Sequence, residues 1–194
     1  MHKISKHKVT LLGTAGCWLL VDITFYGNLL LNASVMKILS FEEQDVKHAI
    51  LFSLIPSAIG LPGYIFTVLF AEKFGRRMIQ MVGFCMMGVI FAIMTFSFDQ
   101  LSKNVPILFL ILYGFTFFFA NFGPNTTTYI IPAEAFPVEI AATCHGISAA
   151  LGKVGAFIGM ALFPVLQAQY STQYVFGACC LISVVGFILT FFLI

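Results

Sequence analysis

Charged residues are scarce in this 194-residue chain, where they make up 9% of the sequence against 60% for hydrophobic residues. A soluble globular domain carries roughly 25% charged and about 45–50% apolar residues. A single soluble core could not bury this much apolar surface away from water. In a bilayer, lipid solvates the outward-facing apolar side chains instead. The composition therefore excludes an ordinary soluble domain and predicts an integral membrane protein surrounded by lipid.

The sequence also lacks the motifs of most catalytic, metal-binding and nucleic-acid-binding proteins. It contains no GxSxG motif, no P-loop and no pair of carboxylates placed for hydrolysis. The five cysteines have neither a CxxC nor a Cys/His metal spacing and lie in apolar stretches, so we interpret them as reduced, buried thiols. The net charge of +2, with no basic run between exposed aromatics, argues against nucleic acid. We expect no enzyme activity, no metal and no other cofactor.

Six segments are long and apolar enough to cross a bilayer, which takes about 20 residues each. They cover residues 11–36, 49–70, 78–96, 105–131, 140–166 and 174–194. The polar joints between them cover 37–47, 71–77, 97–104, 132–139 and 168–173. Because each joint is short, consecutive helices are expected to pack as antiparallel neighbours. No linker interrupts the pattern, so we predict an all-α membrane protein in which residues 1–194 form a single domain of six transmembrane helices.

Basic residues gather on one side of this predicted topology. Six of them precede the first helix or lie in the joint 71–77, and three lie on the opposite side among acidic residues. The two groups are Lys3, Lys6, Lys8, Lys73, Arg76 and Arg77, and Lys37, Lys47 and Lys103. The joint 132–139 carries only acids and breaks the trend. Because basic loops stay in the cytosol, we expect both termini there.

Asp22 lies near the middle of the first predicted helix, where an ionisable group costs about 2.5–3.5 kcal/mol. Trp18, Asp22 and Tyr26 are four residues apart and so lie on one helical face. That face offers an indole donor, a carboxyl group and a phenol, which suit the lining of a polar cavity. The alternative is a carboxyl held by a neighbouring helix for specific packing; we favour the functional role.

Lys153 lies deep in the fifth predicted helix, too far from either end to reach the membrane surface easily. Its ammonium group requires an anion, which is either Asp22 or a substrate. A structural Asp22–Lys153 ion pair is compatible with a functional one, since the pair could close an empty site and open for substrate. Glycines and alanines around Lys153 form a small-xxx-small pattern that allows close helix approach.

Asn121 and Asn125 share a helical face on either side of Pro124, which removes a backbone donor and is expected to kink the helix. Kinked helices are where carriers place ligand groups. The alternative is that nearby threonines satisfy the kink and the asparagines bond between helices. His145 is expected near the cytosolic end of its helix, bonded to a neighbour rather than to a metal.

At these residues the sequence resembles the phosphate:proton symporter family of the major facilitator superfamily. The resemblance rests on the motifs at 13–27, 121–137 and 144–156, and it covers the carboxy-terminal half of such a carrier, helices seven to twelve. The joint 71–77, with Glu72, Gly75, Arg76 and Arg77, resembles the cytoplasmic gating signature of the superfamily, which usually has Asp at the position of Glu72.

The resemblance implies a phosphate site made of Trp18, Asp22, Tyr26, Asn125 and Lys153. Lys153 would supply positive charge to the phosphate, and the indole, phenol and amide would donate hydrogen bonds to its oxygens. Asp22 would be the group whose protonation is coupled to phosphate binding. The implied function is proton-coupled transport of inorganic phosphate across the plasma membrane.

Two departures from the family pattern affect this hypothesis. Residues 138–141 replace arginines that the family often has there, which weakens the expected cytoplasmic charge network. The first six helices of a carrier are also absent, and in this superfamily the substrate lies between two six-helix halves. The partner is then a missing amino-terminal half or a second copy. The alternatives are a carrier of another solute, such as a sugar or organic ion, and a non-transporting scaffold or regulatory half.

Overall fold

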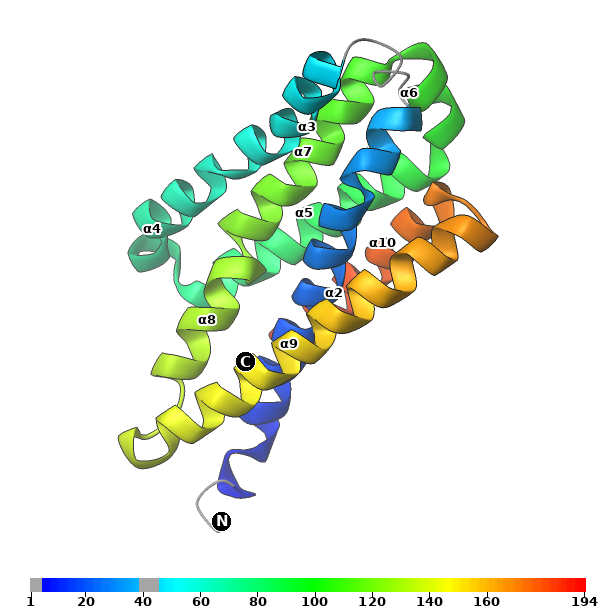
Figure 1. The fold of residues 1–194 in the computed structure, drawn as a ribbon. Coiled ribbons are helices and arrows are strands. Elements are labelled where there is room, and N and C mark those ends of the chain that lie inside the picture. The colour runs from blue at the N-terminus through cyan, green and yellow to red at the C-terminus, as the bar shows by residue number, and fades with distance from the viewer. Residues whose placement is uncertain (1–4, 39–45) are drawn as a thin grey trace.

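The computed structural model describes the backbone of residues 5–38 and 46–194 and the side chains of residues 5–37 and 53–194. Lys3, the centre of the joint 37–47 and the side chain of Lys47, all used to predict the orientation, lie outside the described residues. Almost all described residues are helical (Figure 1). The helices are α2 (Lys8–Ile38), α3 (Val46–Gly60), α4 (Pro62–Phe74), α5 (Arg76–Phe96), α6 (Phe98–Asn104), α7 (Pro106–Phe122), α8 (Pro124–Glu134), α9 (Val138–Gln169) and α10 (Thr172–Leu193).

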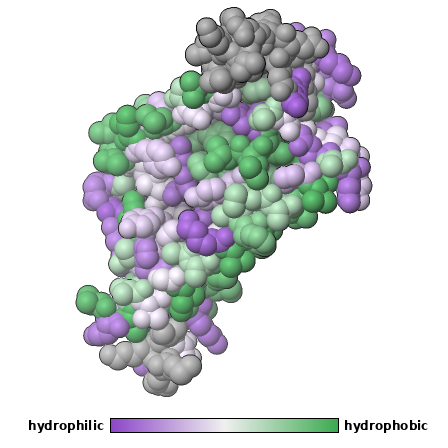
Figure 2. All heavy atoms as spheres, viewed as in Figure 1, coloured by the Kyte–Doolittle hydropathy of each residue, from purple (hydrophilic) through white to green (hydrophobic). Residues whose placement is uncertain are grey.

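Six helical segments within the described ranges are long and apolar enough to span a membrane, and they match the six predicted segments. The spans are Lys8–Lys37, Ser53–Phe74, Arg76–Phe96, Pro106–Glu134, Val138–Gln169 and Thr172–Leu193. The chain is therefore an integral, multi-pass, all-α membrane protein. Its hydrophobic side chains reach the outer surface, as Figure 2 shows for one face, because lipid rather than water surrounds the spans.

Two of the spans are broken, each directly before a proline. The second span divides into α3 and α4 at Leu61, and the fourth divides into α7 and α8 at Gly123. The kink predicted at Pro124 is confirmed, whereas the break before Pro62 was not predicted. The predicted joint 97–104 is itself mostly the short helix α6, and Pro132 lies inside α8 rather than in a joint, because proline is tolerated where neighbouring segments satisfy the freed carbonyl.

α2 lies at the centre of the bundle and packs along α9 and α10. The contact between α2 and α9 depends on glycines: a Cβ atom on Gly155 would collide with the carbonyl of Leu19, and one on Gly159 with the carbonyl of Ile23. The close approach predicted from the small-residue pattern is thus confirmed. This contact fixes Lys153 on α9 beside Asp22 on α2.

Three of the five cysteines are buried, Cys180 is half-buried, and Cys85 is exposed on the outer face of α5. The prediction that all five are buried is wrong for Cys85, because an apolar stretch in a membrane protein has a lipid-facing side that composition does not distinguish from the interior. None of the five forms a disulfide with another described residue.

Candidate functional site

Threonine hydroxyls donate hydrogen bonds to the carbonyls that the break between α7 and α8 leaves without helical donors. Pro124 has no N–H group, and the N–H of Thr126 donates to the carbonyl of Gly123 instead of that of Phe122, so carbonyls of the preceding turn lack helical donors. The hydroxyl of Thr67 donates to the carbonyl of Phe122 at 2.7 Å, and that of Thr126 donates to the carbonyl of Asn121 at 2.6 Å. These bonds satisfy the break from two sides and fix the start of α8, which carries Asn125.

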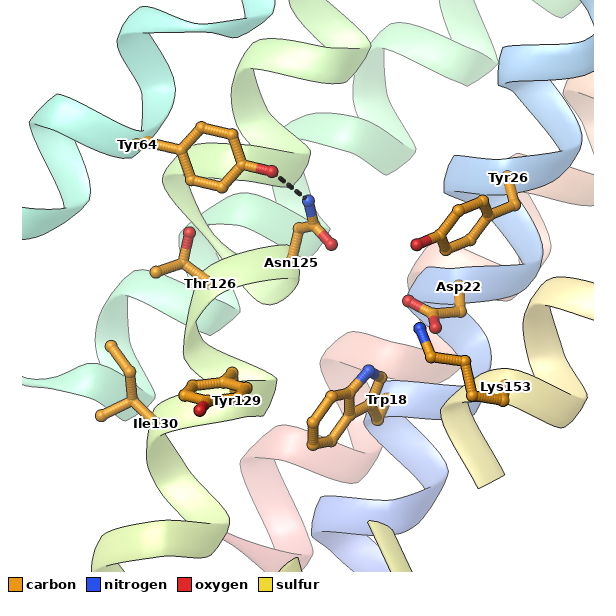
Figure 3. A pocket seen from close by; sticks show the side chains of 9 residues that line it. All are labelled: Trp18, Asp22, Tyr26, Tyr64, Asn125, Thr126, Tyr129, Ile130 and Lys153. Carbon is orange, nitrogen blue, oxygen red and sulfur yellow. Dashed lines mark hydrogen bonds between the residues drawn. The ribbon is translucent and has the colours of Figure 1, made fainter. Parts of the chain in front are cut away.

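A cavity of about 300 Å³ lies between four helices (Figure 3). Three lining side chains come from α2, one from α4, four from α8 and one from α9. They are Trp18, Asp22, Tyr26, Tyr64, Asn125, Thr126, Tyr129, Ile130 and Lys153. All five residues that the sequence predicted for a phosphate site, which are spread over three helices, line this one cavity.

Asp22 and Lys153 face each other across the cavity wall without forming an ion pair. Asp22 is 2% exposed, and its Oδ2 atom has no hydrogen-bond partner among the described side chains and backbone. The Nζ atom of Lys153 lies 5.5 Å from the centre of the Tyr26 ring, and no described carboxylate lies within 4.0 Å of it. The predicted structural ion pair is therefore not formed here, and the cation remains available to an anion.

Asn121 and Asn125 have different surroundings although they share a helical face. Asn121 is buried and donates to the carbonyl of Gly60 at 2.9 Å, which joins α7 to the end of α3. Asn125 lines the cavity, where its amide donates to Tyr64 Oη and to Asn121 Oδ1, both at 2.8 Å. The packing interpretation thus describes Asn121, whereas Asn125 lies at the cavity with its amide close to a second phenol.

Two of the lining residues, Trp18 and Tyr129, form an aromatic cluster with His145. The rings of Trp18, Tyr129 and His145 meet edge to face, with centroid separations of 5.0 to 6.1 Å. His145 contacts its neighbours through its ring, while its buried Nδ1 atom has no hydrogen-bond partner in the described part of the chain. The sequence predicted that His145 bonds to a neighbour, and the described contacts of His145 are ring contacts rather than a hydrogen bond.

Sequence reasoning missed four of the nine lining residues: Tyr64, Thr126, Tyr129 and Ile130. Tyr129 follows Asn125 by four residues, and Tyr64 follows Pro62 and Gly63. Helical spacing and the proline could have indicated both positions. Their convergence on the cavity depends on how α4 and α8 pack.

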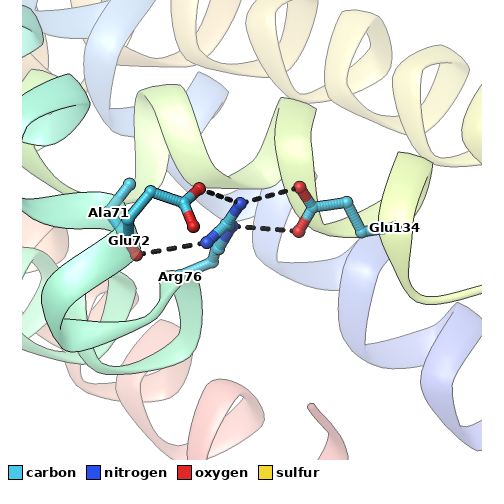
Figure 4. A network of polar contacts seen from close by, with 4 residues as sticks. All are labelled: Ala71, Glu72, Arg76 and Glu134. Carbon is cyan, nitrogen blue, oxygen red and sulfur yellow. Dashed lines mark hydrogen bonds and ion pairs between the residues drawn. The ribbon is translucent and has the colours of Figure 1, made fainter.

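The charged residues of the predicted gating signature lie around the junction of α4 and α5, and none of them is among the nine residues that line the cavity. Figure 4 shows Arg76 between Glu72 and Glu134. Arg76 bridges Glu72, on the preceding turn, and Glu134 at the end of α8, with Nε 3.0 Å from Oε2 of Glu134. Gly75 has φ +82° and ψ 149°, a conformation that is open essentially to glycine alone, and it allows the sharp turn from α4 into α5. Arg77 turns away and donates to the carbonyl of Phe191 on α10.

This architecture has relatives among known proteins. Residues 5–194 match the family described as sugar (and other) transporter. The chain belongs to this family of transporters. The resemblance to the phosphate:proton symporter family of the major facilitator superfamily is confirmed, since the relatives of this family member include several phosphate transporters.

Three such relatives come from plants. Low affinity inorganic phosphate transporter 4 of Medicago truncatula is 40% identical over 164 residues, which are 80% of this chain and 31% of that protein. Low affinity inorganic phosphate transporter 1 of Petunia hybrida is 41% identical over 180 residues, 88% of this chain and 33% of that protein. Inorganic phosphate transporter 1-4 of Arabidopsis thaliana is 41% identical over 166 residues, 80% and 31% respectively. The family member described here thus spans about a third of the length of these relatives.

Proposed function

We propose that this chain contributes the carboxy-terminal half of the phosphate site in a proton-coupled phosphate carrier. One observation carries the proposal: Lys153, unpaired, and Asp22, with one buried oxygen unpaired, line the same cavity as several hydrogen-bond donors. An anion with several acceptor oxygens matches this set better than a neutral sugar, because it neutralises the ammonium group as well as accepting hydrogen bonds.

Each lining side chain has a role in this proposal. Lys153 pairs with the phosphate charge, while Trp18 and Tyr26 donate to its oxygens. Asn125 joins them by exchanging its hydrogen bond to Tyr64 for one to the phosphate. A protonated Asp22 donates to a phosphate oxygen, whereas an ionised Asp22 repels the anion and attracts Lys153. Proton and phosphate therefore bind together, which couples phosphate entry to the proton gradient.

The remaining parts of the carrier follow from this assignment. Residues 1–194 form a single six-helix transmembrane domain, and the other half of the site comes from an amino-terminal half or a second copy. Both termini lie in the cytosol and the carrier lies in the plasma membrane. Glu72, Gly75, Arg76 and Arg77 then lie at the cytoplasmic end, where Arg76 and Glu134 hold α5 and α8 together as part of a gate.

Binding of radiolabelled phosphate to the purified chain in detergent tests the assignment. We expect phosphate to bind in competition with unlabelled phosphate but not with glucose, and Lys153→Ala to weaken binding about 100-fold. Lys103→Ala is the matched control, because Lys103 is an exposed lysine at the far end of α6. Glucose competition would instead favour a sugar carrier, and unchanged binding in Lys153→Ala would contradict the phosphate site. Co-purification with a complete carrier, without phosphate binding, would favour the scaffold.

A further inference from the structure

An apolar groove runs between α5 and α10, on helices that contribute nothing to the nine residues of the cavity. In Figure 1 these two helices lie behind α7, α2 and α9. The groove encloses about 300 Å³, and its walls include Phe84, Cys85, Gly88, Val89, Val184 and Phe187. It contains almost no polar surface, in contrast to the cavity around Lys153.

Gly88 leaves space in this groove rather than allowing two helices to touch. On the same helix, a Cβ atom at Gly83 would lie 2.5 Å from Pro124, and on α10 one at Gly186 would lie 2.5 Å from Phe84. Those glycines are needed for close packing. A Cβ atom at Gly88 would meet Ser183 at 3.6 Å and Val184 at 3.9 Å, which are ordinary contacts. The missing side chain at Gly88 therefore creates room that the described part of the chain does not fill.

A cavity with basic residues in its lining lies next to the groove. This second cavity encloses about 400 Å³ and is lined by Arg77, Met81 and Phe191 among others, one helical turn beyond Cys85 on α5 and Phe187 on α10. The rings of Phe187 and Phe191 stack, and the guanidinium group of Arg77 lies 5.8 Å from the centre of the Phe191 ring. Arg77 and Lys73 are both exposed. From Arg77 to Gly88 the two cavities together extend about 16 Å along α5, close to half the hydrocarbon thickness of a bilayer.

We propose that this groove, defined by the residues lining the two cavities between α5 and α10, binds one anionic phospholipid. Its phosphate lies at Arg77, and one acyl chain lies between α5 and α10 as far as Gly88. The depth of the groove fits a chain within one leaflet, its walls offer only apolar contacts, and its charged end attracts an anionic head group. A partner half that completes the Lys153 cavity meets α2, α4, α8 and α9, and so leaves this groove facing lipid.

Retention of lipid by the purified chain tests the proposal. The chain is reconstituted in vesicles of equal parts phosphatidylglycerol and phosphatidylcholine, extracted in mild detergent, and analysed by native mass spectrometry. We expect one phosphatidylglycerol to remain bound in preference to phosphatidylcholine. Arg77→Gln is expected to reduce that preference about fivefold, the effect of one basic residue near an anionic head group. Gly88→Leu is expected to abolish retention of both lipids by filling the groove.

Gly146→Leu is the matched control, because a Cβ atom at Gly146 on α9 meets nothing within 4 Å. Circular dichroism and elution volume verify that all three variants remain folded. Equal retention in Gly88→Leu and Gly146→Leu would overturn the proposal. So would displacement of phosphatidylglycerol by inorganic phosphate alone, or a dimer that Gly88→Leu dissociates, which would make a second copy the occupant. None of these readouts depends on phosphate transport, so the lipid site and the phosphate site are tested independently of each other.

Discussion

Two clusters of charge in this molecule are built in opposite ways. At the junction of α4 and α5, Arg76 is paired with two glutamates, and all three side chains reach solvent. In the middle of the membrane span, Asp22 is buried with an unpaired oxygen, and Lys153 has no carboxylate partner among the described residues. Placing charges in the span costs free energy that pairing would offset only in part. The charges of the outer cluster therefore neutralise one another, whereas those of the inner cluster are left available to a ligand.

The largest effect is expected at Lys153. Lys153→Ala removes the one cation that lines the described cavity, and phosphate affinity should fall about 100-fold because a desolvated anion then lacks its counter-charge. Stability should change little, since Lys153 is exposed and makes no ion pair. Phosphate titration and thermal unfolding of the same sample measure both quantities. A large loss of stability with retained phosphate affinity would contradict the binding role and show that Lys153 is a structural residue.

Asp22→Asn separates the charge of the inner cluster from its shape. The wild-type protein should bind phosphate more tightly as the pH falls, because only the neutral acid donates to the anion. The amide cannot ionise, so the variant should keep only the pH dependence of the second ionisation of phosphate itself, and its binding should stay within about tenfold of the wild-type value at low pH. Binding is measured from pH 5 to pH 8, with Lys153 and the Tyr26 phenol intact in both proteins. An unaltered pH profile in the variant would show that another group couples the proton.

The two asparagines form a matched pair. Asn125→Ala should weaken phosphate binding about tenfold and leave folding intact, since it removes a donor at the cavity wall. Asn121→Ala should instead lower the free energy of unfolding by about 1–3 kcal/mol, because the buried carbonyl of Gly60 loses its donor. If Asn125→Ala is the variant that fails to fold, the packing interpretation applies to both residues.

The smallest effect is expected at the outer cluster. Arg76→Gln removes ion pairs that water screens, so the free energy of unfolding should change little. Phosphate affinity should change less than twofold, since Arg76 lies outside the cavity. Thermal unfolding and phosphate titration of the variant check this expectation. A loss of affinity comparable with that of Lys153→Ala would mean that the two clusters are coupled.

Much of the architecture could be predicted because a bilayer imposes simple rules. The six spans follow from runs of about 20 apolar residues, and the break at Pro124 follows from the missing N–H group. The break before Pro62 was missed because prolines inside other helices, such as Pro56 and Pro164, do not divide them. Tyr64 and Tyr129 were missed for a different reason: helical spacing and the nearby prolines mark their positions, but whether they reach the cavity depends on how α4 and α8 pack.

By itself, the sequence determined the class of protein, the number of spans, and the few polar groups that a membrane tolerates only at a cost. These properties are local, because hydropathy and helical spacing act over one or two turns. Only the tertiary structure decided which of these groups meet. Asp22 and Lys153 lie close together because glycines on α9 allow its backbone to contact that of α2. Arg76 pairs with Glu134 because α5 packs on α8. These contacts depend on how side-chain volumes fit between helices that are far apart in the sequence, and no short sequence pattern encodes that fit.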